Sequence, residues 1–421
     1  MTTLELVSVP QRESEQYRGF LDEALIDEVQ TLGAELRGIR VLHLNSTAAG
    51  GGVAELLNSL VPLERDCGLQ VEWRLLCPDE QLFTVTKGFH NALQGQPSHL
   101  DEEGKRIYLR HNEHCAAMLS PGAYDVVIVH DPQPAALPQF SASDGPVWIW
   151  RCHIDSSQPD PGVWAFLRPC IERYDAAIFT MKEFVPPDLT GPRLAFIPPA
   201  IDPLSPKNRA LPRYLCRDEV AHFGIDLARP LLLQVARFDP WKDPQGVIDA
   251  YHRVKQQVPQ VQLALVGSRA DDDPEGWLIY NLIRKQADGD PDLHVLTNLN
   301  GVGAHEVNAF QRVADVAIQK SIREGFGLVV SEAVWKETPV VGGNTGGIPL
   351  QIQDGVGGFL VNTVEDCAER ALHLLTHPDD AHEIARRGYE RVRAQFLMPR
   401  LLRDELQLIR LMLGGGGGRH A

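Results

Sequence analysis

The sequence has no long apolar run. No stretch of its 421 residues reaches the roughly 18 consecutive apolar residues that a membrane-spanning helix needs. The opening segment, MTTLELVSVPQRESEQY, also lacks the basic stretch followed by an apolar core that marks a secretory signal. We therefore predict a soluble, cytoplasmic protein with no membrane partner.

Positive charge is scarce as well. Lysine and arginine together number 40 against 56 aspartates and glutamates, which gives a formal net charge of -16 at pH 7. Proteins that bind nucleic acid need basic surfaces to neutralise phosphates, so this balance argues against a nucleic-acid partner. A local cluster of Lys and Arg side chains can still bind a small anion.

Cysteine is sparse and scattered. The seven cysteines include no C-x-x-C pair, which is typical of free thiols in a reducing compartment and argues against a disulfide framework or a zinc site. His111 and His114 lie three residues apart and could share a helix face to bind a metal, but a solvated helix explains them as well. We predict no metal ion and no cofactor.

Apolar runs alternate with segments of helical periodicity along most of the chain. Runs such as GIRVLHLN, YDVVIVHD and PVWIWRC read as buried strands, and VAELLNSLVPLERDCG carries apolar residues at helical spacing. A proline cluster, IPPAIDPLSPKN, interrupts this alternation, which restarts with PLLLQVARF and VQLALVGS. At 46.7 kDa the chain is long enough for two domains of about 200 residues each. The pattern predicts an α/β protein of two Rossmann-like, doubly wound domains facing a cleft.

The domain limits follow from these breaks. We expect an N-terminal domain over residues 1–203 and a C-terminal domain over residues 204–397. A last amphipathic helix over residues 398–413 is expected to pack back on the first domain, and the glycine-rich tail 414–421 to be disordered. A helical segment over residues 18–37 packs at the N-terminal edge or between two copies, which leaves a homodimer open.

Ligands of open parallel sheets bind beyond the carboxyl ends of the strands, so the polar loops that follow strands are the candidate site. STAAGGG follows the first strand and opens a helix, where backbone N–H groups and the helix dipole favour an anion. A glycine run before a helix is weak evidence alone, because any tight turn needs glycine. The loops HDPQPAA, RCHID and RFDPWKD also follow strands.

Two cations and two acids stand out in the second half. Arg237 and Lys242 are five residues apart on a strand-to-helix loop and could hold one anion, although a solvated loop pair is the simpler alternative. In SIREGFGLVVSE, Glu324 and Glu332 are eight residues apart, which predicts that they share one helix face. Glu332 could accept hydrogen bonds from a ribose, or it could be an ordinary exposed helical glutamate.

Together these motifs resemble the retaining nucleotide-sugar glycosyltransferases of the GT-B fold, the group of sucrose and glycogen synthases. The resemblance rests on E-x7-E around Gly-Phe-Gly, the R-x4-K loop and the N-terminal glycine loop. The segments VHDPQPAAL, WRCHID and DDPEGW make the chain most similar to the trehalose glycosyltransferring synthases within that group. Members of this branch join a nucleotide-linked glucose, such as ADP-glucose or UDP-glucose, to free glucose, reversibly and with retention, to give trehalose.

The resemblance implies roles for individual residues. Catalysis would rest on Glu324, His153, Arg237 and Lys242, with the two cations stabilising the leaving diphosphate. The donor-binding set would be Gly51, Gly52, Arg237, Lys242, Gly325, Phe326, Gly327, Leu328, Val329, Glu332 and Asn298. The acceptor-binding set would be Asn45, His130, Asp131, Arg151 and Asp155, with Ser46 and Gly50 on the same wall.

Several alternatives stay open at this point. Asp271 to Asp273 could bind a metal, although the cationic pair already performs that task and a solvated turn explains them. Retention could use a covalent intermediate on a carboxylate or a front-face attack. The acceptor could be fructose, a sugar phosphate or a glucan, and the chain could instead be a nucleotide-sugar epimerase or a binding protein without turnover.

Overall fold

The structure is a computed structural model that describes residues 3–49, 51–141, 145–268 and 274–414. The chain divides into two compact units. Unit 1 holds the residues up to Pro199 together with those from Met398 onward, and unit 2 holds Ala200–Leu397. Gly50, Asp271 to Asp273 and residues 415–421 of the predicted tail lie outside the described residues.

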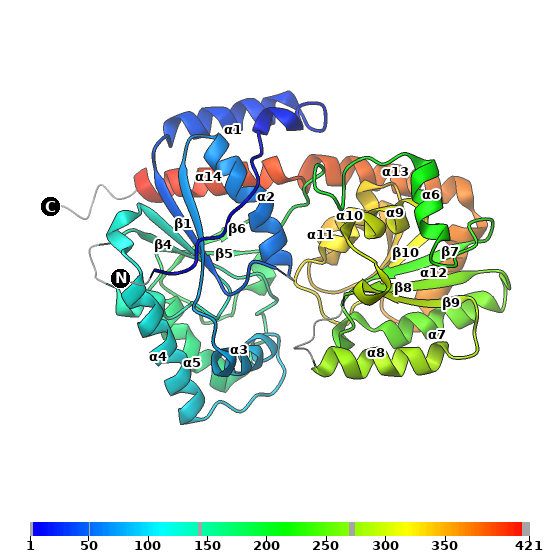
Figure 1. Ribbon diagram of the computed structural model, residues 1–421, viewed down its shortest axis with the longest axis horizontal. Helices are drawn as coiled ribbons and strands as arrows, with labels where there is room; N and C mark the ends of the chain where they lie inside the picture. Colours follow the sequence, from blue (N-terminus) through cyan, green and yellow to red (C-terminus); the bar gives the residue numbers. More distant parts are fainter. Residues whose placement is uncertain (1–2, 50, 142–144, 269–273, 415–421) are drawn as a thin grey trace. The chain divides into compact units, whose positions relative to one another are not determined.

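Unit 1 is built, in its described part, on a six-stranded sheet with the order β2-β1-β3-β4-β5-β6 (Figure 1). Neighbouring strands pair in parallel throughout this sheet. The strands are β1 (Arg40–Asn45), β2 (Gln70–Leu75), β3 (Val126–His130), β4 (Val147–Arg151), β5 (Ala176–Phe179) and β6 (Arg193–Phe196).

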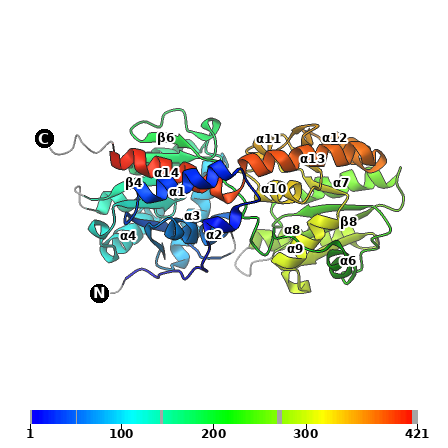
Figure 2. The same ribbon diagram turned by 90° about the horizontal axis from the view of Figure 1, so that it is seen from above.

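Helices cover both faces of this sheet (Figure 1). They are α1 (Glu23–Glu35), α2 (Gly52–Asp66), α3 (Glu80–Leu93), α4 (Glu102–Met118), α5 (Pro161–Ile171) and α14 (Met398–Gly414). Figure 2 shows α14 lying alongside α1, and α14 also contacts α2. The last helix of the chain therefore completes the layer formed by the first two.

The two-residue repeat of the strands sorts their side chains between these layers. One face joins the apolar core of α3, α4 and α5, and its members include Leu42, Leu44, Val127, Val129, Trp148 and Trp150. The intervening positions must point to the opposite face, where α2 and α14 lie. Four of those positions are polar and buried: His43, Asn45, His130 and Arg151. Unit 1 thus has one apolar face and one face that carries charge-bearing groups.

Unit 2 contains, among the residues described, a seven-stranded sheet with the order β12-β13-β11-β10-β7-β8-β9. Its strands are β7 (Leu231–Val235), β8 (Gln262–Gly267), β9 (Leu293–Thr297), β10 (Val316–Gln319), β11 (Val340–Gly343), β12 (Gln353–Asp354) and β13 (Gly357–Val361). Its helices are α6 (Arg213–Ala221), α7 (Pro244–Lys255), α8 (Pro274–Ala287), α9 (Ala304–Val313), α10 (Leu328–Trp335), α11 (Ile348–Gln351), α12 (Val364–Thr376) and α13 (Pro378–Gln395).

Both faces of the unit 2 sheet are apolar. Leu232 of β7 packs in a core with α7 and α12, whereas Leu231 and Leu233 pack in a second core with α6 and α9. Strands buried on both faces read as continuous apolar runs, which is why LLLQV and QLALVG predict them so clearly. The predicted parallel α/β architecture of two domains is confirmed.

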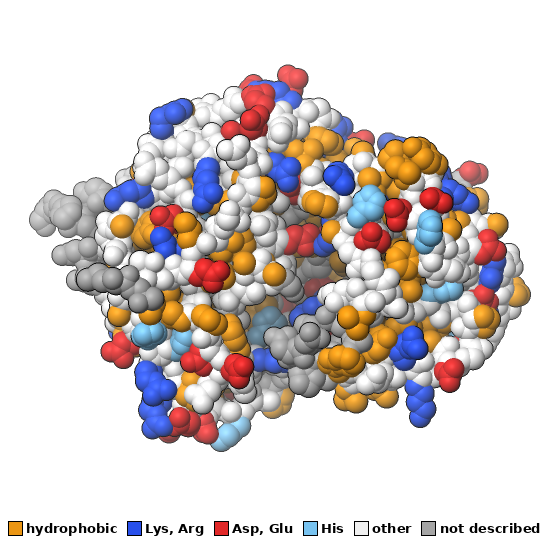
Figure 3. All heavy atoms as spheres, in the orientation of Figure 1, with side chains coloured by type: hydrophobic (Ala, Val, Ile, Leu, Met, Phe, Trp, Pro, Cys, Tyr) orange, Lys and Arg blue, Asp and Glu red, His pale blue; other side chains and the backbone are white. Residues whose placement is uncertain are grey.

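Three further features concern membrane-spanning helices, surface charge and the cysteines. No helix in the described part of the chain is long and apolar enough to cross a membrane. Lys and Arg side chains are interspersed with Asp and Glu on the face drawn in Figure 3. All seven cysteines lie in described segments and are free thiols.

Candidate active site

Lys242 and Glu324 form the centre of the candidate site in unit 2. Lys242 ends a short 3-10 helix, Pro240–Lys242, which follows β7. Its Nζ lies 2.6 Å from Glu324 Oε2, and Ser321 Oγ donates a hydrogen bond of 3.1 Å to the same oxygen. Because Glu324 is only 8% exposed, this ion pair sits in a weakly solvated position where its geometry is well defined.

Arg237 takes a different position from Lys242. Its side chain is 57% exposed, and its partner in the described residues is Asp239, at 3.5 Å. Such an exposed pair contributes little to stability. Arg237 is therefore able to turn toward an anion at small cost, whereas Lys242 already holds a carboxylate.

Two glycines make room for Glu324. Gly327 has a φ of 79°, in the left-handed region, and a Cβ added there would lie 3.0 Å from Glu324 Cγ. A Cβ on Gly346 would lie 1.7 Å from the Glu324 carbonyl oxygen. Gly327 of the sequence motif therefore allows both the left-handed backbone turn and the close approach of the Glu324 side chain.

The predicted shared helix face of Glu324 and Glu332 is wrong. Helix α10 begins at Leu328 with Gly327 as its N-cap, so Glu324 lies in the preceding loop and Glu332 lies inside the helix. The left-handed Gly327 separates the two acids because helical backbone cannot run through that φ. The helix-opening role predicted for EGFGLVVSE is correct, and the backbone N–H groups of Leu328 and Val329 lie in its first turn.

Glu332 is fully buried, which excludes the exposed helical glutamate. Gln311 Nε2 donates a hydrogen bond of 3.4 Å to its Oε2, and Lys207 Nζ lies 3.2 Å from its Oε1. Oε1 accepts no hydrogen bond from any described residue. The carboxylate therefore has a cation beside it and one oxygen with acceptor capacity left.

Three histidines form a chain of hydrogen bonds in unit 1. His43 Nδ1 lies 3.0 Å from His130 Nε2, and His130 Nδ1 lies 2.9 Å from His153 Nε2. The rings are stacked in the same order. His43 and His130 are fully buried, whereas His153, two residues beyond β4, is partly exposed. The outermost histidine is the one that the family resemblance assigns to the sugar.

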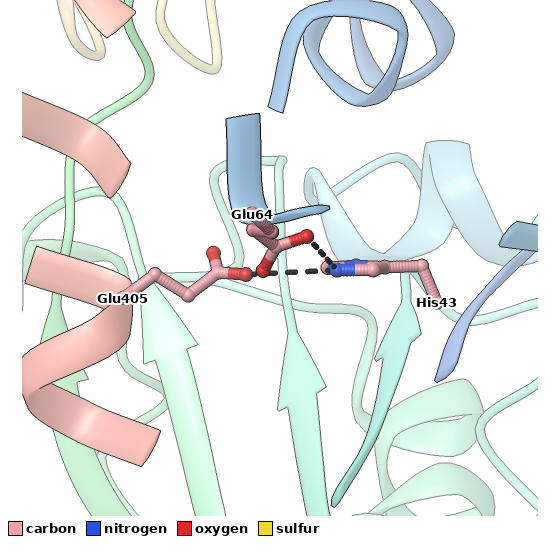
Figure 4. A group of neighbouring side chains, drawn as sticks. All are labelled: His43, Glu64 and Glu405. Atoms are coloured by element: carbon pink, nitrogen blue, oxygen red, sulfur yellow. Dashed lines mark hydrogen bonds and ion pairs between the residues drawn. The ribbon is translucent and has the colours of Figure 1, made fainter. Parts of the chain in front are cut away.

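Two glutamates meet the inner end of this chain (Figure 4). Glu64 projects from α2, and its Oε2 lies 2.9 Å from His43 Nε2. Glu405 projects from α14, with Oε1 3.8 Å from the same nitrogen and Oε2 2.5 Å from Arg151 NH1. All four side chains are buried.

Burial shifts the pKa values of this cluster away from the charged forms. Desolvation raises the pKa of Glu64 to about 8 and that of Glu405 to about 7. It lowers the pKa of His43 to about 4 and the pKa values of His130 and His153 well below the ordinary range. All three imidazoles are therefore neutral near pH 7.

Asp131 links the histidine chain to the loop after β3. Its backbone has a φ of 63°, and its Oδ1 accepts a hydrogen bond of 2.9 Å from the backbone N–H of His153. Desolvation raises the pKa of this carboxyl to about 6. Asp131 thereby holds the backbone of His153 in place, and its strained conformation is of the kind that clusters at functional sites.

The other predicted residues occupy loops and helix ends. Asn45 is held by two hydrogen bonds of 2.7 Å, from Trp73 Nε1 and to the carbonyl of Thr47. Asp155 accepts a bond of 3.0 Å from the backbone of Ser157. Gly51 is the N-cap of α2, and Asn298 begins the 3-10 helix Asn298–Asn300. Asn45, His130, Asp131, Arg151 and His153 gather near the carboxyl ends of β1, β3 and β4, as predicted for a parallel sheet.

Two parts of the chain match known protein families. Residues 43–186 match the family model described as trehalose synthase, N-terminal domain, and residues 217–391 match the one described as glycosyl transferases group 1. A trehalose synthase of Rubrobacter xylanophilus is 54% identical over 402 residues, which cover 94% of this chain and 96% of the relative. A trehalose synthase of Thermococcus litoralis is 47% identical over 396 residues, with 94% and 96% covered.

The chain belongs to the trehalose synthase family. It is a glycosyltransferase that acts in trehalose-related glycosyl transfer. Solved structures share its fold. The sucrose-phosphate synthase of Thermosynechococcus elongatus has a TM-score of 0.67 at 18% identity, and covers 90% of this chain and 100% of its own. A UDP-forming trehalose-phosphate synthase of Burkholderia xenovorans, in complex with glucose-6-phosphate, has a TM-score of 0.69 at 16% identity, with 89% and 100% covered. The GT-B fold expected from the sequence is confirmed.

Sequence reasoning missed several residues that the structure brings to the candidate site. They are Ser321 and Lys207 in unit 2 and His43, Glu64 and Glu405 in unit 1. A signal for Glu405 was present, because it falls four residues after Leu401 and four before Ile409 on the buried stripe of α14. An acid on an apolar helix stripe needs a buried partner, and that need could have drawn attention to it.

Proposed function

We propose that the chain is a retaining glucosyltransferase that forms trehalose from a nucleoside diphosphate glucose, ADP-glucose or UDP-glucose, and free glucose, in a reversible reaction. The observation that carries the proposal is the Lys242–Glu324 ion pair next to the start of α10. It brings a cation for a leaving phosphate and a carboxylate for a sugar within one hydrogen bond of each other.

The donor residues are assigned from this pair outward. Lys242 and the exposed Arg237 hold the diphosphate and stabilise the charge that grows on it as the glycosidic bond breaks. The N–H groups that open α10 supply further donors for the phosphate and sugar oxygens. Glu324 orients the sugar and favours the positive charge that develops on its ring, and the leaving phosphate takes the acceptor's proton in a front-face attack.

Glu332 is the proposed partner of the donor ribose. Its Oε1 has acceptor capacity that no described residue fills with a hydrogen bond, and a ribose hydroxyl would supply the missing donor. Lys207 Nζ lies 3.2 Å from the same oxygen. Asn298, at the carboxyl end of β9, is proposed to face the nucleotide base.

The acceptor residues belong to unit 1. His153 is partly exposed, and we propose that it contacts the transferred glucose, with Asp155 and Asn45 on the acceptor side. His130 and Arg151 are buried at 0% and 1% exposure, so we assign them supporting roles behind His153 and Asp131. Gly51 and Gly52 open α2 and are proposed to let backbone N–H groups approach the donor.

An acceptor panel tests this function. Purified protein is given labelled ADP-glucose or UDP-glucose with glucose, fructose, glucose 6-phosphate, a short glucan or no acceptor, and the products are separated. We expect α,α-trehalose with glucose alone as acceptor. Conversion of the donor without an acceptor would indicate an epimerase, and a disaccharide formed with another acceptor would reassign the specificity. A trehalose phosphorylase of Pleurotus pulmonarius is 32% identical over 395 residues, which cover 82% of this chain and 53% of the relative. A further arm with trehalose and inorganic phosphate therefore tests for phosphorolysis.

A further inference from the structure

We propose that Glu64 and Glu405 hold one shared proton and that this pair, acting through His43 and His130, fixes which ring nitrogen of His153 carries hydrogen. The two glutamates and two inner histidines are thus positioning residues for His153. The proposal deepens the proposed function, on which the contact between His153 and the sugar rests. The tautomer of His153 can be measured in the protein without substrate, and therefore independently of the proposed function.

The first step is the direction of the hydrogen bonds. A neutral imidazole has one N–H donor and one acceptor nitrogen. Both nitrogens of His43 and both nitrogens of His130 lie in hydrogen bonds of the chain. The donors must therefore all point toward Glu64 or all point toward His153, and the group at the inner end selects the direction.

The second step is the proton count at the inner end. Glu64 Oε1 and Glu405 Oε1 are buried, and neither accepts a hydrogen bond from the described residues. Carboxylate oxygens of Glu64 and Glu405 lie within 4.8 Å of each other, and two carboxylates that close in a buried site cannot both stay charged. One proton between these two oxygens satisfies both of them and leaves a single negative charge, which the guanidinium of Arg151 balances.

The protonation of the glutamate pair sets the direction of the hydrogen bonds along the three histidines. With its Oε1 on the shared proton, Glu64 is left with Oε2 as an acceptor, so His43 donates through Nε2–H. His130 then donates through Nε2–H to His43, and His153 through Nε2–H to His130. His153 Nδ1 is left with its lone pair. In this state His153 offers a hydrogen-bond acceptor, not a donor, to a sugar hydroxyl.

Other charges near the cluster are compatible with this state. Arg65 of α2 acts electrostatically on His43, and Asp404 of α14 and Asp131 act on Arg151. The raised pKa values of Glu64 and Glu405 agree with a proton retained by the pair near neutral pH. The lowered pKa values of the three histidines agree with a chain of neutral rings.

A metal ion is the competing occupant of this cluster. His43, Glu64 and Glu405 offer ligand atoms that all lie within 4.8 Å of one another. Arg151 places a positive charge at Glu405, where it would repel a cation. This charge favours a proton over a metal ion, and metal content is measured in the test.

Histidine 15N spectra of the full chain test the proposal directly. We expect His153 in the wild type to be protonated at Nε2 and unprotonated at Nδ1. Glu64→Gln keeps this pattern, because its amide oxygen accepts from His43 while its NH2 group donates to Glu405. Glu64→Leu removes the acceptor, and the signals of His43, His130 and His153 should all shift toward a mixture of tautomers. Protonation of wild-type His153 at Nδ1 would overturn the proposal. So would a His153 signal that stays unchanged in Glu64→Leu while the His43 signal shifts.

Infrared spectroscopy gives a second readout if Glu64→Leu does not fold. The wild type should show the carbonyl band of a protonated carboxyl near pH 7, and either Glu64→Gln or Glu405→Gln alone should abolish it. Loss of this carbonyl band in only one of the two variants would contradict the shared proton. Stoichiometric metal in the purified protein would also contradict it. Turnover is measured last, and kcat should fall by roughly tenfold or more in Glu64→Leu and by less in Glu64→Gln. A correct tautomer without trehalose synthesis would sink the proposed function and leave this inference intact.

Discussion

At the scale of single residues, the two glutamates of the SIREGFGLVVSE segment lie in different surroundings. Glu324 is in a loop, paired with Lys242, whereas Glu332 is sealed within unit 2 beside Lys207 and Gln311. The sequence spacing suggested one shared helix face. The left-handed Gly327 ends the loop that holds Glu324 and precedes the helix that holds Glu332, so the two acids contact different groups. Substitution can test whether their roles differ as well.

Glu324→Gln and Glu332→Gln should separate these roles. The first removes a charge next to a developing cation, so kcat should fall strongly with donor binding little changed. The second weakens a hydrogen bond that is present in the ground and transition states alike, so the donor KM should rise. The loss in donor binding free energy should be about 1.5 to 3 kcal/mol at most. Calorimetry with free nucleoside diphosphate should show weaker binding only for Glu332→Gln. Glu337→Gln, an exposed residue just after α10, is the control. Equal losses for Glu324→Gln and Glu332→Gln would mean that the roles are wrongly assigned.

Lys242 and Arg237 should replace a metal ion in binding the diphosphate. Lys242→Ala is expected to lower kcat on the order of 10²-fold through loss of leaving-group stabilisation, and Arg237→Ala to cost less because its side chain is exposed. A chelator should leave the activity of the wild type intact. Activity that disappears with chelator and returns with magnesium or manganese would contradict this assignment and return attention to Asp271 to Asp273.

At the scale of elements, α14 does more than cover an apolar surface. Its Glu405 binds Arg151 of β4, and both side chains are buried. Removing one partner of a buried ion pair leaves the other charge unpaired, which is far more costly than removing both. The contact therefore ties the last helix of the chain to the centre of the unit 1 sheet.

Glu405→Ala should consequently destabilise the protein by about 3 to 5 kcal/mol in urea unfolding. The double variant Arg151→Met with Glu405→Leu should recover much of this loss, because no charge is left buried alone. Arg410→Ala is the matched control on α14. It removes an exposed contact with Glu35 of α1 and should have a small effect. A loss for Glu405→Ala no larger than that of the control would contradict the account of α14.

The stability of unit 1 should also depend on pH in a defined window. Between about pH 7 and 8 most histidines are uncharged in the folded and unfolded chains alike. The pKa values of Glu64 and Glu405 are raised to about 8 and about 7, so the folded chain holds protons that the unfolded chain does not. The free energy of unfolding should therefore fall as pH rises through this window, by at most about 1.4 kcal/mol per pH unit for each proton held. Below about pH 6.5 the lowered histidine pKa values act in the opposite direction, because the unfolded chain takes up protons.

Urea unfolding at several pH values measures this dependence, with Glu64→Gln as the comparison. The variant has one titrating carboxyl fewer, so its stability should vary less between about pH 7 and 8. The same slope in both proteins would show that the buried pair holds no extra proton.

The elements themselves were largely predictable, and the buried cluster was not. Doubly buried strands such as β3 and β8 are continuous apolar runs, and α12, α13 and α14 have clear helical periodicity. Strand β13 was missed because it begins with two glycines, Gly357 and Gly358, both with positive φ. The histidine chain joins residues that are 21, 87 and 23 positions apart, and Arg151 and Glu405 are separated by 254. No local pattern carries such pairings, because they depend on strand order and helix packing.

At the scale of the whole molecule, the two family matches fall on different units. The group 1 glycosyltransferase match covers Arg237, Lys242, Glu324 and Glu332 in unit 2, and the trehalose synthase match covers His43, Glu64, His130 and His153 in unit 1. We infer that donor chemistry common to many glycosyltransferases resides in unit 2, and that the features particular to trehalose reside in unit 1. The choice of glucose as acceptor is then the most specific part of the account.

The most direct measurement is the stoichiometry of one reaction. Nucleoside diphosphate glucose labelled at the sugar anomeric carbon is incubated with unlabelled free glucose, and NMR follows the products over time. The account predicts one α,α-linked trehalose and one nucleoside diphosphate for each donor consumed, with the anomeric configuration of the donor retained. Trehalose with an inverted linkage, or donor consumed without any trehalose, would contradict it.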